Sequence, residues 1–290
     1  MQRVFVTGAS SELMRSVLSD FSENEYQIIA LSRTKNDDEG NISWVKGDLN
    51  DPRSYSDYLE KVDVIIHAAA ITHSRAAEEY FRINLDGTKH LIEEAQKHGN
   101  PRFVFISSRT ATKESGAYGE SKLQAEQLVK AMTESWLILR PAEVYGGNKG
   151  EGIDGAIASA IQGGIQPCPI GLASKMYPIH TKDAAKAIST LIRNQARDNA
   201  VEYINGPEAL SFKELLKLVG SETNRKVMVF PVPKFLMKIA AWLSGRLNIN
   251  LGFAPDQVDR LYCKKQQGAA SATTISVHQY VRKLIQKGTL

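Results

Sequence analysis

The chain has 290 residues, 42% of them hydrophobic and 23% charged, which is enough for one large domain or two coupled domains. The net charge of +4 arises from 36 basic and 32 acidic residues spread along the chain, and this pattern does not favour a nucleic-acid-binding protein. The two cysteines, Cys168 and Cys263, lack the spacing of a disulfide framework or a metal site, so we expect neither.

The first residues predict a strand rather than a signal peptide. No apolar run reaches the roughly 18 residues that a membrane-spanning helix needs. We therefore expect a cytoplasmic protein without a transmembrane segment.

Residues 2–7 form an apolar run typical of a strand, and residues 11–21 have helical spacing. Gly8 lies in the turn between them. A strand, a glycine turn and a helix bring backbone amides and the positive end of the helix toward a pyrophosphate. Ser11 and Met14 occupy positions where further glycines would favour close approach and close packing.

The next apolar run, residues 26–31, ends in Ser32 and Arg33 instead of an acidic residue. A carboxylate there would bind the ribose 2′-hydroxyl of NAD, whereas an arginine would bind the 2′-phosphate of NADP. Arg33 therefore favours NADP, with a solvated surface arginine as the alternative.

Two further predicted strands, residues 42–45 and 62–66, also end in candidate cofactor-binding residues. Asp48 follows the first strand and is expected to bond an adenine amino group. Small residues follow His67 after the second strand and would let the cofactor lie against the backbone, while His67 itself is expected to be structural. Asn84 lies inside a predicted helix, residues 80–95, and its unfavourable helix propensity suggests a polar role.

Residues 103–108 predict a buried strand that ends in Ser107 and Ser108, and a helix follows from Tyr118 to about residue 132. Tyr118 and Lys122 are one turn apart and share a helix face. A lysine ammonium there would lower the tyrosine pKa from about 10 toward neutral pH. With Ser108 holding a substrate oxygen, these residues predict a hydride-transfer site beside a nicotinamide.

Residues 145–149 repeat the tyrosine–lysine spacing, but Gly146 and Gly147 disfavour a helix there. Up to this point strands alternate with helices, which predicts a parallel sheet with ligands at the carboxyl ends of its strands. Residues 235–247 have apolar side chains at helical spacing, and we expect them to pack on the protein's own core rather than on a membrane surface. The other predicted elements after the helix at Tyr118 are a strand at 136–141, a helix at 153–162, a loop at 166–170, a helix at 181–192, a strand at 202–205, a capped helix at 211–219 and a loop at 264–274.

As an ordered set, the motifs resemble the short-chain dehydrogenase/reductase superfamily, in its extended branch, the NAD-dependent epimerase/dehydratase family of nucleotide-sugar enzymes. The resemblance implies an α/β fold, a Rossmann-like doubly wound parallel sheet with a smaller α/β substrate-binding domain. Residues 1–145, with about 177–205, would form the dinucleotide-binding domain, and residues 146–176 and 206–290 the smaller domain. A homodimer through the helices at about 77–97 and 118–132 is also implied. The motifs are Thr7-Gly8-Ala9, Gly47-Asp48-Leu49, His67-Ala68-Ala69, Asn84 with Gly87-Thr88, Ser107-Ser108, Tyr118 with Lys122, Arg140-Pro141 with Val144-Tyr145-Gly146, and His180 with Asp183.

The resemblance also implies a role for each matching position, with no metal site. Tyr118 would be the acid/base, Lys122 would hold the nicotinamide ribose, and Ser108 would orient the substrate. The expected substrate-binding residues are Ser108, Tyr118, Glu143, Lys175 and His180. The expected cofactor-binding residues are Thr7, Gly8, Ser10, Ser11, Leu13, Ser32, Arg33, Asp48, Leu49, Ala68, Ala69, Ala70, Asn84, Ser107, Tyr118, Lys122, Pro141 and Val144.

Several positions depart from the family pattern. Ser11 and Met14 break the glycine series, which predicts a reshaped turn or a reduced cofactor affinity. Arg109 and Thr110 replace the acidic pair of the dehydratases, and this disfavours dehydration. Only nine residues separate Ser108 from Tyr118, which suggests a trimmed substrate loop.

Residues 229–233, followed by an apolar helix, look most like the 4-keto-sugar reductases that act on nucleotide-linked sugars. Net reduction also fits the NADP preference expected from Arg33, since an epimerase recycles its own NAD. The leading expectation is therefore an NAD(P)-dependent 4-keto-sugar reductase. An NAD-dependent nucleotide-sugar 4-epimerase is the alternative, and a catalytically idle Rossmann scaffold or cofactor-sensing protein is an alternative from another class.

Overall fold

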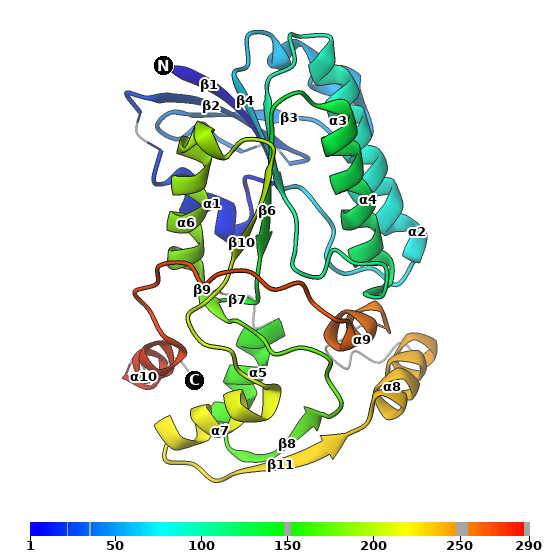
Figure 1. Ribbon diagram of the computed structural model, residues 1–290, viewed down its shortest axis with the longest axis vertical. Coiled ribbons are helices and arrows are strands. Elements are labelled where there is room, and N and C mark those ends of the chain that lie inside the picture. Colours follow the sequence, from blue (N-terminus) through cyan, green and yellow to red (C-terminus); the bar gives the residue numbers. More distant parts are fainter. Residues whose placement is uncertain (22, 35, 148–151, 248–254, 287–290) are drawn as a thin grey trace.

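The computed structural model describes residues 1–286 except for residues 22, 35, 148–151 and 248–254. Its centre is a seven-stranded parallel sheet in the order β10-β6-β5-β4-β1-β2-β3, with helices on both faces (Figure 1). This architecture confirms the predicted Rossmann-like class. The strands are β1 (Gln2–Thr7), β2 (Tyr26–Ser32), β3 (Ile42–Lys46), β4 (Val64–His67), β5 (Arg102–Ile106), β6 (Trp136–Pro141) and β10 (Ala200–Ile204).

The sheet buries both of its faces, which is why its strands are almost continuously apolar. Val4 and Val6 of β1 enter one hydrophobic cluster and Phe5 enters the other, because side chains alternate along a strand. Helices α1 (Glu12–Leu18) and α6 (Thr181–Arg193) cover the first face, and α3 (Gly87–Gln96) and α4 (Gly116–Met132) cover the second (Figure 1).

The predicted helix at 80–95 consists of three segments in the structure. A π-helical segment, Phe81–Asp86, joins α2 (Ala77–Tyr80) to α3. Buried Asn84 lies in this segment, so the residue that disfavours a regular helix is found where the helix is irregular.

A smaller group of elements lies below the sheet around its own hydrophobic cluster (Figure 1). It includes a parallel ribbon of two strands, β8 and β11, and the predicted capping box of α7 is present, with Ser211 and Glu214 bonded reciprocally. The domain boundaries expected from the sequence stay a prediction. The remaining elements are η1 (Pro52–Ser54), η2 (Ser56–Leu59), β7 (Val144–Tyr145), α5 (Gly152–Ile161), β8 (Gly164–Pro169), β9 (Ile179–His180), η4 (Gln195–Arg197), α7 (Phe212–Glu222), β11 (Val227–Val232), α8 (Lys234–Leu247), α9 (Pro255–Tyr262) and α10 (Val277–Gln286).

The prediction of a loop at 166–170 is wrong, because most of this segment belongs to strand β8. Its prolines led to the loop assignment. Pro167 and Pro169 lie opposite Phe230 and Val232 of β11 in a ribbon of only two strands, where each strand is an edge that tolerates proline.

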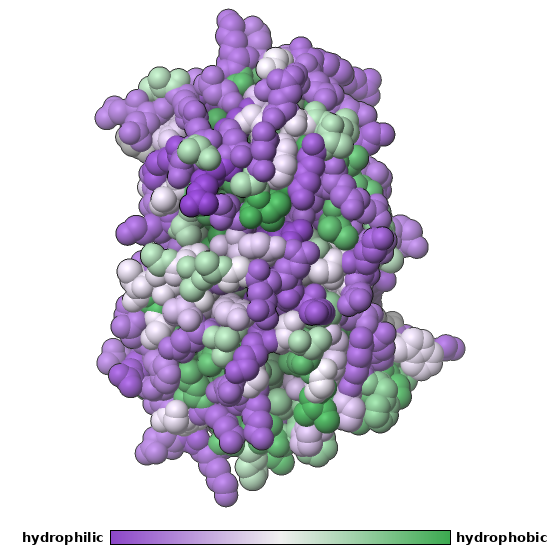
Figure 2. Space-filling view, viewed as in Figure 1, coloured by the Kyte–Doolittle hydropathy of each residue, from purple (hydrophilic) through white to green (hydrophobic). Residues whose placement is uncertain are grey.

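The prediction that helix α8 packs its large apolar residues on the core is also wrong. Phe235 is 61% exposed and Trp242 is 57% exposed, whereas the helix packs on Val258 of α9 through the smaller Ala241 and through Met237. Figure 2 shows hydrophobic side chains at the lower end of the molecule, where β8, β11 and α8 lie. Within the described part of the chain, no helix is long and apolar enough to span a bilayer.

His67, at the end of β4, is fully buried and bonded at both ring nitrogens. Nδ1 lies 2.6 Å from Thr7 Oγ1 and Nε2 lies 2.8 Å from Thr88 Oγ1. The Thr88 hydroxyl donates to the carbonyl of Asn84, so it accepts from a proton on Nε2 of His67. Burial, with a smaller effect from Lys122, lowers the pKa of His67 to about 3. These contacts agree with the structural role expected for His67.

We predict that His67 makes stability fall as the pH drops below 6.5, because the unfolded chain then binds a proton that the folded protein does not. Between about pH 7 and pH 5 this contributes about 2 kcal/mol of lost unfolding free energy. His67→Gln should be less stable at neutral pH by roughly 1–3 kcal/mol but lose less on acidification. Urea unfolding at several pH values measures this, and equal pH slopes for the two proteins would contradict it.

Candidate active site

The predicted site residues gather where the strands of the sheet end. Thr7, the last residue of β1, is in register with His67 of β4 and with Leu31 of β2. Ile106, the last residue of β5, pairs with Leu139 of β6. The turns after these strands therefore open at one edge of the sheet, as expected for parallel strands.

The turn after β1 requires glycine. Gly8 has φ +72°, and a Cβ there would lie 2.6 Å from the backbone nitrogen of Ala69 and 2.7 Å from the carbonyl carbon of Ala68. This close approach, together with the small residues after β4 and the N-terminus of α1, forms a cradle that fits a dinucleotide.

The two departures from the glycine series leave the strand, turn and helix in place. Ser11 is the N-cap of α1 and accepts a hydrogen bond from the backbone of Met14. The Met14 side chain is buried in the core between the sheet and α6. The lower cofactor affinity expected from these residues stays a prediction.

Asn84 fixes the backbone that follows β4. Its side chain accepts from the nitrogen of Ile71 at 2.8 Å and donates to the carbonyl of Ile71 at 3.2 Å. It also donates to Ser121 Oγ on α4. The polar role expected for Asn84 is therefore to hold the segment containing Ala70 against the helix that carries Tyr118.

Ser108, Tyr118 and Lys122 meet at the end of β5 and the start of α4. Tyr118 and Lys122 are buried, and a hydrogen bond joins Ser108 to the Tyr118 side chain. Lys122 donates to the carbonyl of Ile106 at 2.7 Å and lies 4.0 Å from the ring centroid of Phe105. The predicted catalytic residues therefore lie together.

The electrostatics at Tyr118 differ from the expectation. Burial raises the pKa of Tyr118, and the cation that opposes this effect is Arg260, followed by the hydrogen bond from Ser108. The guanidinium carbon of Arg260 lies 4.1 Å from the centroid of the Tyr118 ring. Burial lowers the pKa of Lys122 to about 7, while Glu126 opposes that shift. The cation beside the Tyr118 phenol is thus Arg260, and the lowering of the Tyr118 pKa expected from Lys122 stays a prediction.

Arg260 belongs to α9, a helix that meets the N-terminus of α4. Asp256, on the same helix, accepts from the backbone nitrogen of Tyr118 at 3.0 Å and pairs with Arg260 at 2.7 Å. A carboxylate is favourable at that helix end. Sequence reasoning missed both residues, because an acidic and a basic residue one turn apart are common on exposed helices.

A buried ion pair supports the base of the site. Glu126, one turn beyond Lys122, pairs with Arg140 of β6 and accepts from Ser107 Oγ. Arg140 also donates to Tyr203 of β10 at 3.0 Å. These contacts join α4 to the ends of three strands. The sequence motif contained Arg140 without revealing its partner.

Glu143, expected to bind substrate, is held by two cations. Its carboxylate lies 2.6 Å from Lys265 Nζ and 3.2 Å from Arg109 Nη1, and it accepts from the backbone of Tyr177. Burial alone would raise the pKa of Glu143, but Lys265 and Arg109 hold it below its usual value. Glu143 therefore joins the exit from β6 to the loop after α9.

Two other expected substrate residues contact structural partners. Lys175 pairs with Glu214 of α7 at 3.5 Å, and His180 caps α6 while packing against the rings of Tyr145 and Tyr280. Their roles in substrate binding stay predictions.

Two of the expected adenosine-side residues lie on the surface. Arg33 is exposed just beyond β2, and its role in cofactor binding stays a prediction. The Asp48 carboxylate accepts from the backbone nitrogen of Asn50 at 2.9 Å.

The tyrosine of the second tyrosine–lysine spacing lies in a short strand rather than on a helix. Tyr145 is buried in β7 and donates to the carbonyl of Ile275 at 2.8 Å, and Lys149 lies outside the described residues. No group of three or more His, Cys, Asp or Glu residues in the described chain could hold a metal ion.

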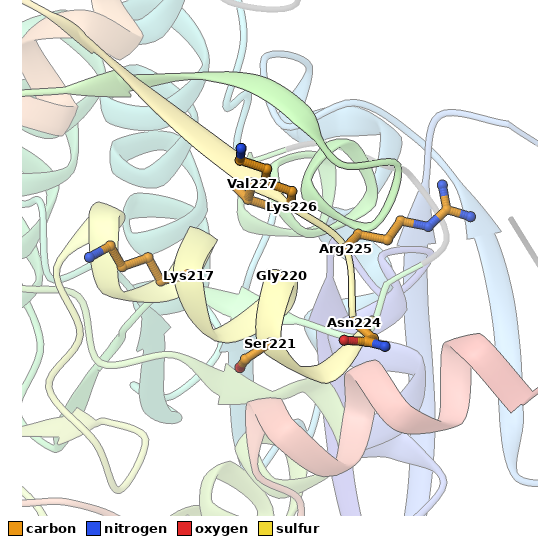
Figure 3. A pocket seen from close by; sticks show the side chains of 7 residues that line it. All are labelled: Lys217, Gly220, Ser221, Asn224, Arg225, Lys226 and Val227. Atoms are coloured by element: carbon orange, nitrogen blue, oxygen red, sulfur yellow. The ribbon is translucent and has the colours of Figure 1, made fainter.

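A groove of about 510 Å³ lies elsewhere, between α7 and the start of β11 (Figure 3). It contains none of the predicted catalytic residues. Its lining residues are Lys217, Gly220, Ser221, Asn224, Arg225, Lys226 and Val227.

A glycine turn at the N-terminus of α1, together with a buried tyrosine and lysine on α4 beside the end of β5, is the arrangement expected of an enzyme that binds a nicotinamide cofactor. The chain belongs to the NAD dependent epimerase/dehydratase family, whose model matches residues 4–205. This result confirms the resemblance found in the sequence and shows that the protein is an enzyme.

Individual relatives point to several activities within the family. Ceramide reductase from Caulobacter vibrioides is 30% identical over 198 residues, which cover 66% of this chain and 61% of the relative. UDP-glucose 4-epimerase from Vibrio cholerae is 25% identical over 279 residues, covering 85% of this chain and 83% of the relative. The structure of MoeE5 in complex with UDP-glucose and NAD has a TM-score of 0.72 and 19% identity, covering 99% of this chain and 100% of MoeE5. At this identity the structural likeness establishes the fold alone.

We predict that one lysine titrates near pH 7 in the cofactor-free protein, because burial favours the neutral form of Lys122. Lys122 is charged below that pH and neutral above it, whereas the unfolded chain keeps this proton up to about pH 10.5. The penalty for burying the charge is thus complete below pH 7 and disappears between pH 7 and 10.5. Lysine side-chain NMR should show a low-pKa signal that Lys122→Met removes; titration of every lysine near its ordinary value would contradict this.

A second prediction concerns Arg260. Arg260→Gln should raise the pKa of Tyr118 further, because it removes the main cation that stabilises the phenolate. Arg260→Lys, which keeps the charge, should give a smaller change. Phenolate absorbance can be followed against pH, with Tyr118→Phe as the baseline. An unchanged pKa in Arg260→Gln would show that burial and Ser108 alone set it.

Proposed function

We propose that the protein is a cytoplasmic NADPH-dependent reductase of a nucleotide-linked 4-keto sugar. The observation that carries the reductase assignment is Arg33, exposed beyond β2 where a carboxylate would favour NAD. An enzyme that consumes a reductant fits NADPH, whereas an epimerase regenerates its cofactor in each cycle. The relative named ceramide reductase also supports a reduction.

The residues at the site fit this reaction. A bound nicotinamide would supply the hydride. Tyr118 would donate its phenolic proton to the reduced carbonyl oxygen, and Ser108 would hold that oxygen beforehand. Lys122 would bond the ribose, and Arg260 would stabilise the phenolate left after proton transfer. Within the described residues Arg109 Nη2 is buried without a hydrogen-bond partner, so it is a donor available to a sugar hydroxyl.

The nucleotide-sugar part of the proposal draws on the relatives. UDP-glucose 4-epimerase matches most of this chain, and MoeE5 was solved with UDP-glucose. The same two proteins favour the alternative of an NAD-dependent 4-epimerase. The idle-scaffold alternative fits poorly with a family of enzymes and with a complete set of Ser108, Tyr118 and Lys122. Pairing of two subunits through α3 and α4 remains part of the proposal.

Cofactor titrations would test the proposal. NADPH should bind more tightly than NADH, and Arg33→Ala should weaken NADPH binding roughly 10- to 100-fold with little effect on NADH. Arg53→Ala is a matched control, since the Arg53 side chain is 95% exposed on another segment. Equal Kd values for NADPH and NADH that do not change in Arg33→Ala would contradict the cofactor preference.

Turnover assays then distinguish a reductase from an epimerase. Net oxidation of NADPH with a nucleotide-linked 4-keto sugar, lost in Tyr118→Phe while cofactor binding is retained, is the expected result. Interconversion of nucleotide sugars without net change in the cofactor would instead identify an epimerase. Cofactor binding with neither reaction would reject both assignments.

A further inference from the structure

Three elements of the smaller group, the two strands of the ribbon and helix α8, expose large apolar side chains. We define the apolar face as Ile165 of β8, Met228 and Phe230 of β11, and Phe235, Ile239 and Trp242 of α8, all of which are exposed. Figure 2 shows hydrophobic side chains at this end of the molecule. Large apolar side chains exposed together at one end of a molecule are a sign of a binding surface.

The exposure on the ribbon follows from strand alternation. Val227 and Val229 of β11 turn inward and pack on the cluster of α5, α7 and α10. Met228 and Phe230 therefore lie on the outer face, and Ile165 is the register partner of Met228. The ribbon thus has apolar residues on both faces, and among the described residues only its inner face is covered.

Helix α8 also exposes its larger apolar residues and buries smaller ones. Phe235, Ile239 and Trp242 follow one another at helical spacing and form an exposed stripe. The opposite side, with Met237 and Ala241, packs against α9. A helix in water ordinarily buries its largest apolar residues. The described residues leave those of α8 exposed, and this orientation favours a binding partner for the stripe.

The chain segment that carries most of the apolar face is basic. Residues 223–255 contain five basic residues, Arg225, Lys226, Lys234, Lys238 and Arg246, and no acidic residue. Figure 3 shows Arg225 and Lys226 at the start of β11, near Lys217 of α7. Lys234 and Lys238 begin α8 and share the single carboxylate of Asp259. Cations therefore occur at both ends of β11, and α9 only partly neutralises them.

We propose that the apolar face binds the surface of an anionic lipid bilayer. Helix α8 would lie in the membrane plane, with Phe235, Ile239 and Trp242 at the boundary between headgroups and acyl chains. The lysine and arginine side chains would reach the lipid phosphates. The guanidinium of Arg246 already lies 5.4 Å from the ring centroid of Trp242, so this pair combines a cation and an aromatic ring as interfacial anchors do.

Charge complementarity favours a lipid surface over a second copy of this chain. In a symmetric dimer each face would meet its own counterpart. The basic residues of one copy would then approach those of the other with almost no carboxylates between them, which is unfavourable. An anionic bilayer offers acyl chains to the apolar residues and phosphate groups to the cations. This inference stands independently of the proposed reaction.

Vesicle flotation with the purified full chain tests the proposal. The protein should float with vesicles of equal parts phosphatidylcholine and phosphatidylglycerol but much less with phosphatidylcholine alone, and salt should weaken the binding. Tryptophan fluorescence should shift to shorter wavelength on binding, and Trp242→Phe should remove that shift. The double variant Phe235→Ser with Ile239→Ser should bind at least ~10-fold more weakly.

Matched control variants test whether vesicle binding requires the apolar face or only exposed apolar and basic residues in general. Ile285→Ser changes an exposed apolar residue on α10 and should leave vesicle binding unchanged. Arg225→Gln with Lys226→Gln should weaken binding and reduce its salt dependence, whereas Arg53→Gln with Lys61→Gln should not. An unchanged far-ultraviolet circular dichroism spectrum and an unchanged urea-unfolding midpoint show that each variant is folded.

Three results would overturn the proposal. Wild-type protein that floats with neither kind of vesicle rules out a lipid surface. Equal loss of binding in the α8 and α10 variants rules out this face. A solution dimer that becomes a monomer in Phe235→Ser with Ile239→Ser, without vesicle binding by the wild type, would assign the face to a second copy of the chain.

Discussion

The site depends on the contact between helix α9 and the first turn of α4. Asp256 accepts the backbone N–H of Tyr118, and Arg260 lies over the ring of the same residue. One short helix thus fixes the position of the phenol and supplies the cation beside it. Because α9 follows the ribbon and α8 in sequence, the second half of the chain completes a site whose other residues come from α4 and from the turn after β5.

Buried charges organise the region below this contact. Glu126 with Arg140 joins α4 to the sheet, and Glu143 with Arg109 and Lys265 joins the exit of β6 to the loop after α9. Such pairs add little net stability, because removing the charges from water costs about as much as their attraction returns. Leaving one partner alone is costly, however, so each pair excludes arrangements in which its segments separate. Their main effect is therefore to fix positions.

The sequence allowed much of this to be predicted because the relevant signals are local. Apolar runs of strand length, the turn at Gly8 and the spacing of Tyr118 and Lys122 each involve neighbouring residues. The contributions that were missed depend on contacts across the chain: Arg260 reaches Tyr118 from a distant helix, and β8 becomes a strand only by pairing with β11. The exposure of α8 was missed for another reason, since helical spacing identifies an apolar stripe but not what covers it.

The π-helical segment at Phe81–Asp86 has a geometric consequence for the site. A wider turn changes the angular phase of the helix, so residues before and after it can face directions that a regular helix would not combine. Tyr80, ahead of the segment, lies edge-on to the Tyr118 ring, and Thr88, beyond it, bonds His67 under the cradle. The π-helical turn therefore lets residues of one continuous helical stretch contact both Tyr118 and His67.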